Sequence, residues 1–465
     1  MNFTPSLRTV GIAPSQPRLP GADALSVLLL CDYRPEGARM VSDHIEALAR
    51  YSSHHMTVVS NIGDLPRFLE LGRFDVVVVH YSVFIASDGY MSPLARERLR
   101  AYDGVKAMFI HDEYRTVDRT IEAMRLIGID VVFTCVPLAE IEKVYDPRKL
   151  ANTRFVNVLT GYVPERLATP RLHPAYRDRP IDVGYRGRAY PAWHGSLGRE
   201  RVAIASRFAA DAQRLGLKVD ISVREEDRLY GPAWDAFLAA SKATLGTESG
   251  CSIVDFTGEI EAQVEAHVRR APDTDYETLR LTYFADVEDQ IDLRQISPRC
   301  FEAIAARSML ILYEGEYSGV LRPWRHFVPL AKDHGNMTEV VAVLTDFERA
   351  ETIIDQAHCE VLLNPSYSER AAVARFDREI ADMVMARPRR ARATPYAAGE
   401  LERAIHARRA VRSVAGAGRF AAASPVGLRA TRRKRPAGRH SRRPPWGTAR
   451  PARRSRGRRT APSPR

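Results

Sequence analysis

Short apolar runs alternate with amphipathic stretches along the first third of the chain. In the stretch 41–51, for example, Ile45, Leu48 and Ala49 fall on one side of a helix. Short buried strands that alternate with helices predict a parallel sheet with helices on both faces. We therefore expect a Rossmann-like domain over residues 25–168, preceded by a flexible N-terminus at 1–24. The runs predicted to form its strands are 25–32, 56–60, 74–80, 105–111, 131–135 and 155–159.

The same pattern restarts after a segment rich in Pro and Arg. Residues 169–180 (TPRLHPAYRDRP) have the composition of a linker. From 181 to 386 the alternation predicts a second domain of the same class, interrupted by a charged helical insertion at 258–288. The expected fold class is α/β, with two Rossmann-like, doubly wound domains facing a central cleft. The strands predicted in the second domain are 181–186, 219–223, 243–246, 309–313 and 327–330.

The charge of the chain changes sign near its end. The whole sequence has a formal net charge of +12, from 69 basic and 57 acidic residues. Residues 387–465 hold 24 of the basic residues and 2 of the acidic ones, so residues 1–386 carry 45 basic and 55 acidic side chains. The globular part is therefore mildly acidic, which argues against a nucleic-acid-binding protein and leaves only the tail for polyanions.

The segment 387–465 is expected to be a disordered, Arg-rich tail, because Arg, Ala, Pro, Gly and Ser cannot supply a buried core. Three interpretations are an arm for nucleic acid or a membrane surface, a solvated tail, and an out-of-frame translation of GC-rich DNA. The abrupt shift in composition favours the third, and sequencing the end of the gene tests it.

Cysteine usage and hydropathy exclude several classes of protein. The five cysteines are odd in number, far apart and without a C-x-x-C, which argues against a disulfide framework or a zinc site and for a reducing compartment. No apolar run is long enough to cross a bilayer, and the N-terminus has no apolar core of a secretory signal. We expect a cytoplasmic protein with no metal or other cofactor, because no acidic pair in the sequence requires magnesium.

Clusters of small and charged residues follow the predicted strands of the second domain, where doubly wound sheets bind their ligands. In the first cluster, 182–188 (DVGYRGR), Gly187 permits close backbone approach, while Arg186 and Arg188 offer forked donors to a diphosphate. Arg199 lies near the start of the next helix, whose dipole favours an anion there. The alternative interpretation is a strand-end turn with solvated arginines.

The second cluster is 245–251 (LGTESGC), again just after a predicted strand. Ser249 and Gly250 would expose backbone N–H groups to phosphate oxygens, and Glu248 could accept the hydroxyls of a sugar or ribose. The alternative is an ordinary polar loop. We take Glu248 as one of two catalytic candidates.

The third cluster is 297–318 (SPRCFEAIAARSMLILYEGEYS). Pro298 suits the start of a helix, and a carboxylate near that end of the helix, Glu302, is favoured and can face the ligand crevice. The alternative is an exposed first-turn glutamate. The donor-binding candidates in this segment are Arg299, Glu302, Glu314 and Gly315.

The other catalytic candidate, His111, ends a predicted strand of the first domain and faces the expected cleft. The ordinary pKa of histidine lies near neutrality, so His111 could take the proton of an acceptor hydroxyl. Asp112 or Glu113 could orient it or bind a metal. A strand-end histidine is also commonly a packed or capping residue, and His80 with Tyr81 forms a similar pair.

With these clusters in this order, the second domain resembles the nucleotide-sugar-binding half of GT-B glycosyltransferases, which have two Rossmann-like domains. It is most similar to the bacterial spore-maturation-type glycosyltransferases. The resemblance covers about residues 181–386, while the first domain matches only in fold pattern. It rests on Gly187-Arg188, on Glu248-Ser249-Gly250, and on 298–306 (PRCFEAIAA) followed by an apolar strand.

The resemblance also implies roles for individual residues. Arg188 and Arg199 would meet the diphosphate, Glu302 the ribose, and the loop 248–250 the donor sugar or the phosphates. The chain departs from the family in three places. Arg307-Ser308 replaces the usual glycine after the helix. The usual lysine near the opening helix is not obvious, so that Arg199 or Arg201 would have to substitute, and the insertion between Gly250 and Pro298 breaks the usual tight spacing of two glutamates.

The function implied is that of a hexosyltransferase-like enzyme of bacterial polysaccharide biosynthesis. It would move a sugar from a nucleoside-diphosphate-sugar donor to a carbohydrate or another cell-surface polymer, with peripheral membrane or polyanion contacts through the basic tail and no specific nucleic acid. The alternatives are a nucleotide-sugar epimerase on the same fold, a non-enzymatic two-domain signalling protein, and a polyanion-binding protein driven by the tail.

Overall fold

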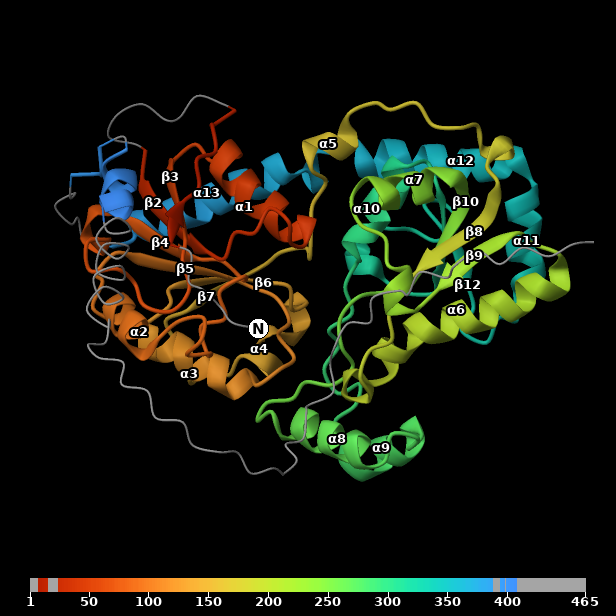
Figure 1. The fold of residues 1–465 in the computed structure, drawn as a ribbon, viewed down its shortest axis with the longest axis horizontal. Coiled ribbons are helices and arrows are strands. Elements are labelled where there is room, and N and C mark those ends of the chain that lie inside the picture. The colour runs from red at the N-terminus through yellow and green to blue at the C-terminus, as the bar shows by residue number, and fades with distance from the viewer. Residues whose placement is uncertain (1–6, 16–23, 388–393, 398, 408–465) are drawn as a thin grey trace, which may run out of the picture. The chain divides into compact units, whose positions relative to one another are not determined.

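The first lobe is built on a seven-stranded sheet formed by the apolar runs near the N-terminus (Figure 1). The computed structural model describes residues 7–15, 24–387, 394–397 and 399–407. The strand order is β1-β3-β2-β4-β5-β6-β7, and every pair is parallel except β1 with β3. The strands are β1 (Arg8–Thr9), β2 (Ser26–Cys31), β3 (His55–Ser60), β4 (Val76–Val79), β5 (Val105–Ile110), β6 (Val131–Thr134) and β7 (Arg154–Asn157).

Successive side chains along these strands pack into two different helical layers, because neighbouring residues of a strand point to opposite faces. Leu28 and Leu30 of β2 share a core with α2 and α3, whereas Val27 and Leu29 share a core with α1 and α13. Figure 1 shows these two layers on opposite sides of the sheet. The helices are α1 (Arg39–Tyr51), α2 (Pro93–Arg100), α3 (Val117–Ile127), α4 (Ile141–Val144), α5 (Glu165–Ala168) and α13 (Glu369–Met385).

The second lobe contains a five-stranded, fully parallel sheet in the order β12-β11-β10-β8-β9. Val183 of β8 packs with α6, α11 and α12, and Leu310 of β11 packs with α10. Its strands are β8 (Ile181–Arg186), β9 (Val219–Ser222), β10 (Ser241–Gly246), β11 (Met309–Tyr313) and β12 (Val328–Leu330). Its helices are α6 (Gly195–Leu215), α7 (Pro232–Ala240), α10 (Pro298–Ala305), α11 (Met337–Thr345) and α12 (Phe347–Ala357).

The predicted insertion between β10 and α10 forms two helices, α8 (Glu259–Arg270) and α9 (Tyr276–Tyr283). Its apolar side chains surround Trp193, in a small core of its own. Arg115, in the loop after β5, forms an ion pair with Glu261 of α8. The insertion therefore contacts both lobes.

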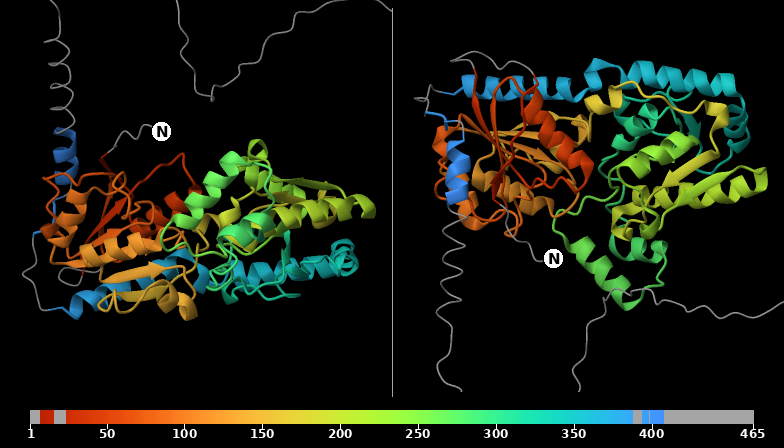
Figure 2. Two further views of the ribbon diagram at one scale, coloured as in Figure 1. Left: turned by 90° about the horizontal axis from the view of Figure 1, so that it is seen from below. Right: turned by 45° about the horizontal axis from the view of Figure 1, so that its top comes forward.

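The last long helix departs from the predicted domain assignment. Residues 368–385 lie within the range 181–386 that the sequence assigns to the second domain, yet α13 packs beside α1 of the first lobe (Figure 2). Phe376 and Ile380 belong to the core behind the first sheet. The Asp377 carboxylate accepts hydrogen bonds of 2.7 Å from the hydroxyl of Ser52 and from the N–H and hydroxyl of Ser53.

Two terminal segments also differ from the predicted disorder. Within the expected flexible N-terminus, β1 pairs with β3. Within the expected tail, residues 400–407 are helical, and Leu401 and Ile405 are buried against the first lobe. Residues 408–465, which hold most of the predicted tail, lie outside the described residues.

The predicted fold class is confirmed, because both sheets are doubly wound, parallel apart from the edge strand β1, and covered by helices on both faces. Both lobes belong to one compact structural unit, which spans Met1–Arg409. Among the described residues, no helix combines the length and the apolar composition that crossing a membrane requires.

Candidate active site

Three adjoining hollows lie at the carboxyl ends of the strands of both sheets. The central cleft is lined by His111 and Asp112 from the first lobe and by Arg201, Ser249 and Gly250 from the second. The basic pocket shares Arg201 with this cleft and continues between β8, β10 and α10. The apolar chamber shares His111 and Pro298 with the cleft and extends between α1, α10 and α13. The central cleft therefore lies between the other two hollows. Arg201 lies where it meets the basic pocket, and His111 lies where it meets the apolar chamber.

Two guanidinium groups give the basic pocket its charge. Arg201 donates to the hydroxyls of Tyr190 (3.1 Å) and Ser249 (3.4 Å), and Arg299 lies over the ring of Trp234. Among the described residues, neither arginine has an ion-pair partner, and Arg299 also donates to the backbone carbonyl of Arg186. The first turn of α10 adds the positive end of a helix dipole. An anion with several oxygens is the ligand that such a pocket favours.

Arg186, which also lines this pocket, is occupied within the protein. It forms an ion pair with Asp220 (2.8 Å) and donates to the backbone carbonyls of Tyr185, Asp220 and Asp227. Its guanidinium also lies over the Phe237 ring at 4.4 Å. These internal partners leave Arg186 unsuited to the diphosphate contact that the sequence predicts.

The other two predicted arginines lie outside the three hollows. Arg188 is exposed, with its guanidinium 4.6 Å from the centre of the Tyr190 ring. Arg199 is also exposed and stacks on Tyr276 of α9 at 4.2 Å. Gly187 lies against the Tyr185 ring, which a β-carbon there would approach to 2.8 Å.

The three residues predicted in the loop after β10, Glu248, Ser249 and Gly250, do not all face the same hollow. Ser249 and Gly250 line the central cleft. Glu248 instead points toward the loop after β11, where its carboxylate accepts the N–H of Tyr317 (2.7 Å) and lies against Gly315. Burial raises the pKa of Glu248, which lines none of the three hollows. Glu314 is exposed beside it.

Gly250 occupies a position that a larger residue does not fit. Its φ is +117°, and an added β-carbon would lie 2.1 Å from the carbonyl oxygen of Leu293. Gly250→Ala should lower the free energy of unfolding by about 2–4 kcal/mol, since it adds a backbone clash to an unfavourable backbone conformation. Gly63→Ala is the matched control, because φ is +82° there but nothing lies within 4 Å. Urea unfolding should show a loss of about 1 kcal/mol for the control. Equal losses in the two variants would mean that the clash is absent.

Glu302 lies on α10 but faces the apolar chamber rather than the basic pocket. Its carboxylate accepts the indole N–H of Trp234 at 2.8 Å, and burial raises its pKa. Because the same indole lines the basic pocket, Glu302 supports that wall from behind. The structure therefore places Arg299 in the basic pocket, Gly250 in the central cleft, Arg201 in both and Glu302 in the apolar chamber. Arg188 lies outside all three.

His111 directly follows β5, at the junction of the cleft and the chamber. Its ring stacks on Tyr81 with centroids 3.9 Å apart and planes within 5°. Burial lowers the pKa of His111 to about 4, so the imidazole is neutral at neutral pH. Asp112 follows with a φ of 54°, a conformation uncommon for residues other than glycine, and its carboxylate accepts the hydroxyl of Tyr114 (3.1 Å).

Glu113 does not orient His111. Its buried carboxylate accepts the hydroxyls of Thr134 and Tyr145 and the N–H of Cys135 (2.9 Å). Burial raises the pKa of Glu113 to about 7. Among the described residues, no group of three His, Cys, Asp or Glu side chains is arranged to hold a metal ion.

His44 also lines the chamber, although the sequence analysis did not identify it. Its hydrogen bonds determine which ring nitrogen carries the proton. Nδ1 of His80 accepts the N–H of Ser82 (3.0 Å), so the proton of His80 is on Nε2. That N–H donates to Nδ1 of His44 at 2.9 Å, which leaves the proton of His44 on its own Nε2. Burial lowers the pKa of His44 to about 3. The only signal in the sequence was the helical spacing that places His44 between Met40 and Leu48.

Comparisons with known proteins found matches among solved structures alone. No protein-family model matches the chain, and no curated protein matches it in sequence. The chain is similar to the solved structure of Anabaena Alr3699/HepE in complex with UDP-glucose, at 10% identity and a TM-score of 0.41, covering 78% of this chain and 100% of that one. It is similar to an alpha-glucosyltransferase in complex with UDP-glucose and DNA, at 7% identity and a TM-score of 0.42, covering 77% and 98%. The crystal structure of TarM matches at 9% identity and a TM-score of 0.38, over 68% of this chain and only 57% of TarM.

Proposed function

We propose that the protein transfers a sugar from a nucleoside-diphosphate sugar to an acceptor hydroxyl. The observation that carries the proposal is the series of hollows, which joins two arginines without carboxylate partners to one neutral histidine. Arg201 and Arg299 would hold the diphosphate in the basic pocket, where their charge stabilises the leaving group. His111 would face the acceptor across the central cleft.

In the proposed reaction the acceptor oxygen bonds to the anomeric carbon of the sugar while the bond from that carbon to the diphosphate breaks. The proton of the acceptor hydroxyl passes to the neutral imidazole of His111. The electron pair of the broken bond leaves with the diphosphate, whose added negative charge faces the guanidinium groups. The finer prediction of a spore-maturation-type enzyme that acts in polysaccharide biosynthesis rests on the sequence resemblance alone.

A thermal-shift titration of the full chain tests donor binding. Nucleoside diphosphates and their sugars should raise the melting temperature increasingly as their concentration exceeds the dissociation constant. Arg299→Ala should lose most of this shift, because its side chain lines the basic pocket. Arg188→Ala is the matched control and should keep the shift, because Arg188 lies outside the hollows. A flat response of the wild-type protein to every nucleotide would refute the proposal, and equal responses of the two variants would refute the assigned pocket.

A further inference from the structure

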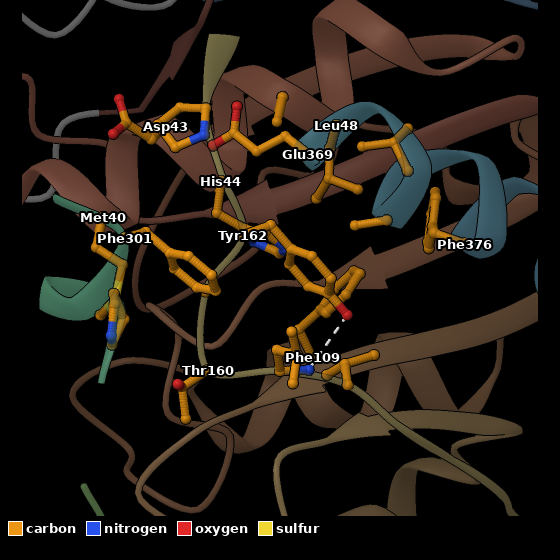
Figure 3. Close-up of a pocket in the computed structure, with 18 of the residues that line it drawn as sticks. Met40, Asp43, His44, Leu48, Phe109, Thr160, Tyr162, Phe301, Glu369 and Phe376 are labelled. Carbon is orange, nitrogen blue, oxygen red and sulfur yellow. Dashed lines mark hydrogen bonds between the residues drawn. The ribbon is translucent and has the colours of Figure 1, made fainter. Parts of the chain in front are cut away.

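The apolar chamber is walled mainly by hydrocarbon. Phe109 and Phe133 come from the first sheet, Phe301 from α10, and Val373 and Phe376 from α13. Figure 3 shows Phe109, Phe301 and Phe376 around the chamber, together with Leu48 and His44 of α1. These apolar side chains are nearly fully buried, so a hydrocarbon ring or chain that entered the chamber would contact mainly hydrocarbon.

Most polar groups of the chamber already have partners inside the protein. Arg166 forms an ion pair with Asp43 at 2.7 Å. The hydroxyl of Tyr162 accepts the N–H of Leu159 (3.2 Å; dashed in Figure 3), and Arg375 donates to the carbonyl of Asn157 (2.9 Å). The carboxylate of Glu302 and Nδ1 of His44 are likewise occupied, by Trp234 and His80.

Few hydrogen-bonding groups remain for a ligand. Nε of Arg166 is buried without a partner. Among the described residues, no acceptor is found for the Nε2–H of His44 or the hydroxyl proton of Tyr162, and no hydrogen bond of the Glu369 carboxyl is found. Burial and the neighbouring Asp43 raise the pKa of Glu369 to about 8, so this carboxyl is mostly protonated at neutral pH. A carbohydrate with several hydroxyls would leave many of them unpaired here, which is costly in a buried site. An apolar body has no hydroxyl groups of its own to leave unpaired on entering.

The position of His111 connects this chamber to the proposed chemistry. Its ring lines both the chamber and the central cleft, and it has a low pKa caused by burial. A molecule that fills the chamber from this junction would present one end to the cleft, beside Arg201 and the proposed donor pocket. That end is the place for a hydroxyl group.

We propose that the apolar chamber binds the hydrocarbon body of the acceptor, an alcohol or phenol whose hydroxyl lies at His111. The acceptor class then differs from the carbohydrate or surface polymer expected from the sequence. That this compound is the acceptor rests on the proposed function. The binding of an apolar hydroxyl compound in the chamber does not depend on that function.

Calorimetric titration of the full chain with two series of compounds tests the proposal. In the aliphatic series, butanol, hexanol and octanol, affinity should rise about fourfold for each added methylene if a chain is the ligand. In the aromatic series, naphthol should bind more tightly than phenol if a ring is the ligand. Either trend supports the proposal and identifies the kind of body. No saturable binding in either series, or tighter binding of maltose than of every alcohol, overturns it.

Two variants on one helix locate the binding. Ala372 lines the chamber, so Ala372→Trp should fill it and weaken binding of the better series by about tenfold or more. Ala374 is exposed on the same helix, and Ala374→Trp is the control that should bind as wild type does. Should the tryptophan prevent folding, Ala372→Leu gives the same direction with a smaller change. Equal binding by the filled and control variants overturns the proposal.

Nucleotide-induced thermal shifts of the same variants separate this proposal from the proposed function. If the chamber inference alone is wrong, nucleotides still stabilise the protein while no alcohol binds. If the transferase proposal alone is wrong, alcohols bind in an Ala372-sensitive way and no nucleotide stabilises the protein.

Discussion

Replacing His111 by alanine should lower the turnover number for sugar transfer by about 10²–10⁴-fold, the usual contribution of a general base. The ring lies between the cleft and the chamber, and no other side chain described here has an unoccupied imidazole at that junction. His267→Ala is a suitable control, because this histidine bonds Tyr283 and Thr274 within the insertion. Steady-state kinetics with a saturating donor provides the measurement.

The pH dependence of the rate shows whether the general base has the low pKa of the buried His111 or that of an ordinary histidine. A general base works when it is neutral, so the rate should hold while the pH is above the pKa of about 4 that burial gives this group. The rate should therefore stay level from pH 7 to about pH 5 and fall below that, whereas an ordinary histidine would cause a fall below about pH 6.5. If His111→Ala keeps more than half of the wild-type rate, His111 is not the base.

Arg201→Ala should reduce kcat/KM for the donor by about 10²–10³-fold, because the guanidinium belongs to both the basic pocket and the cleft. Arg201→Lys should recover only part of the loss, since lysine keeps the charge but not the forked geometry that matches phosphate oxygens. The comparison is made by initial rates over a range of donor concentrations.

Arg207→Ala, on the same helix, provides the control for this loss. The Arg207 side chain is exposed and donates to the carbonyl of Lys332, away from the three hollows. Activity of Arg201→Ala equal to that of Arg207→Ala would show that the donor is held elsewhere.

The sequence predicted the strands well because each is a short apolar run that ends in a turn. The predicted strand 181–186 coincides with β8, and 309–313 coincides with β11. Periodicity reveals which face of an element is buried but not what covers it. For that reason α13 was assigned to the second domain, although its apolar stripe completes the first.

The site was harder to predict than the fold, because a motif places a residue at a strand end without fixing the direction of its side chain. Arg186 meets Asp220 of the neighbouring strand, and Glu248 turns toward the loop at Gly315. On α6, Arg199 and Arg201 are two residues apart and so point to nearly opposite sides of the helix. The sequence offered both as substitutes for a lysine, and only the position of the second sheet relative to α6 decides that Arg201 lines the cleft.

Because α13 completes the core of the first lobe, that core can form only late in translation. The strands of the first sheet leave the ribosome about 200 residues before α13 does, a delay of roughly 10 to 40 seconds at usual elongation rates. During that interval Phe109 and Phe133 lack the side chains of Phe376 and Ile380 that later cover them. The nascent protein thus carries an uncovered apolar face for close to half of its synthesis, a face of the kind to which chaperones that hold unfinished chains bind.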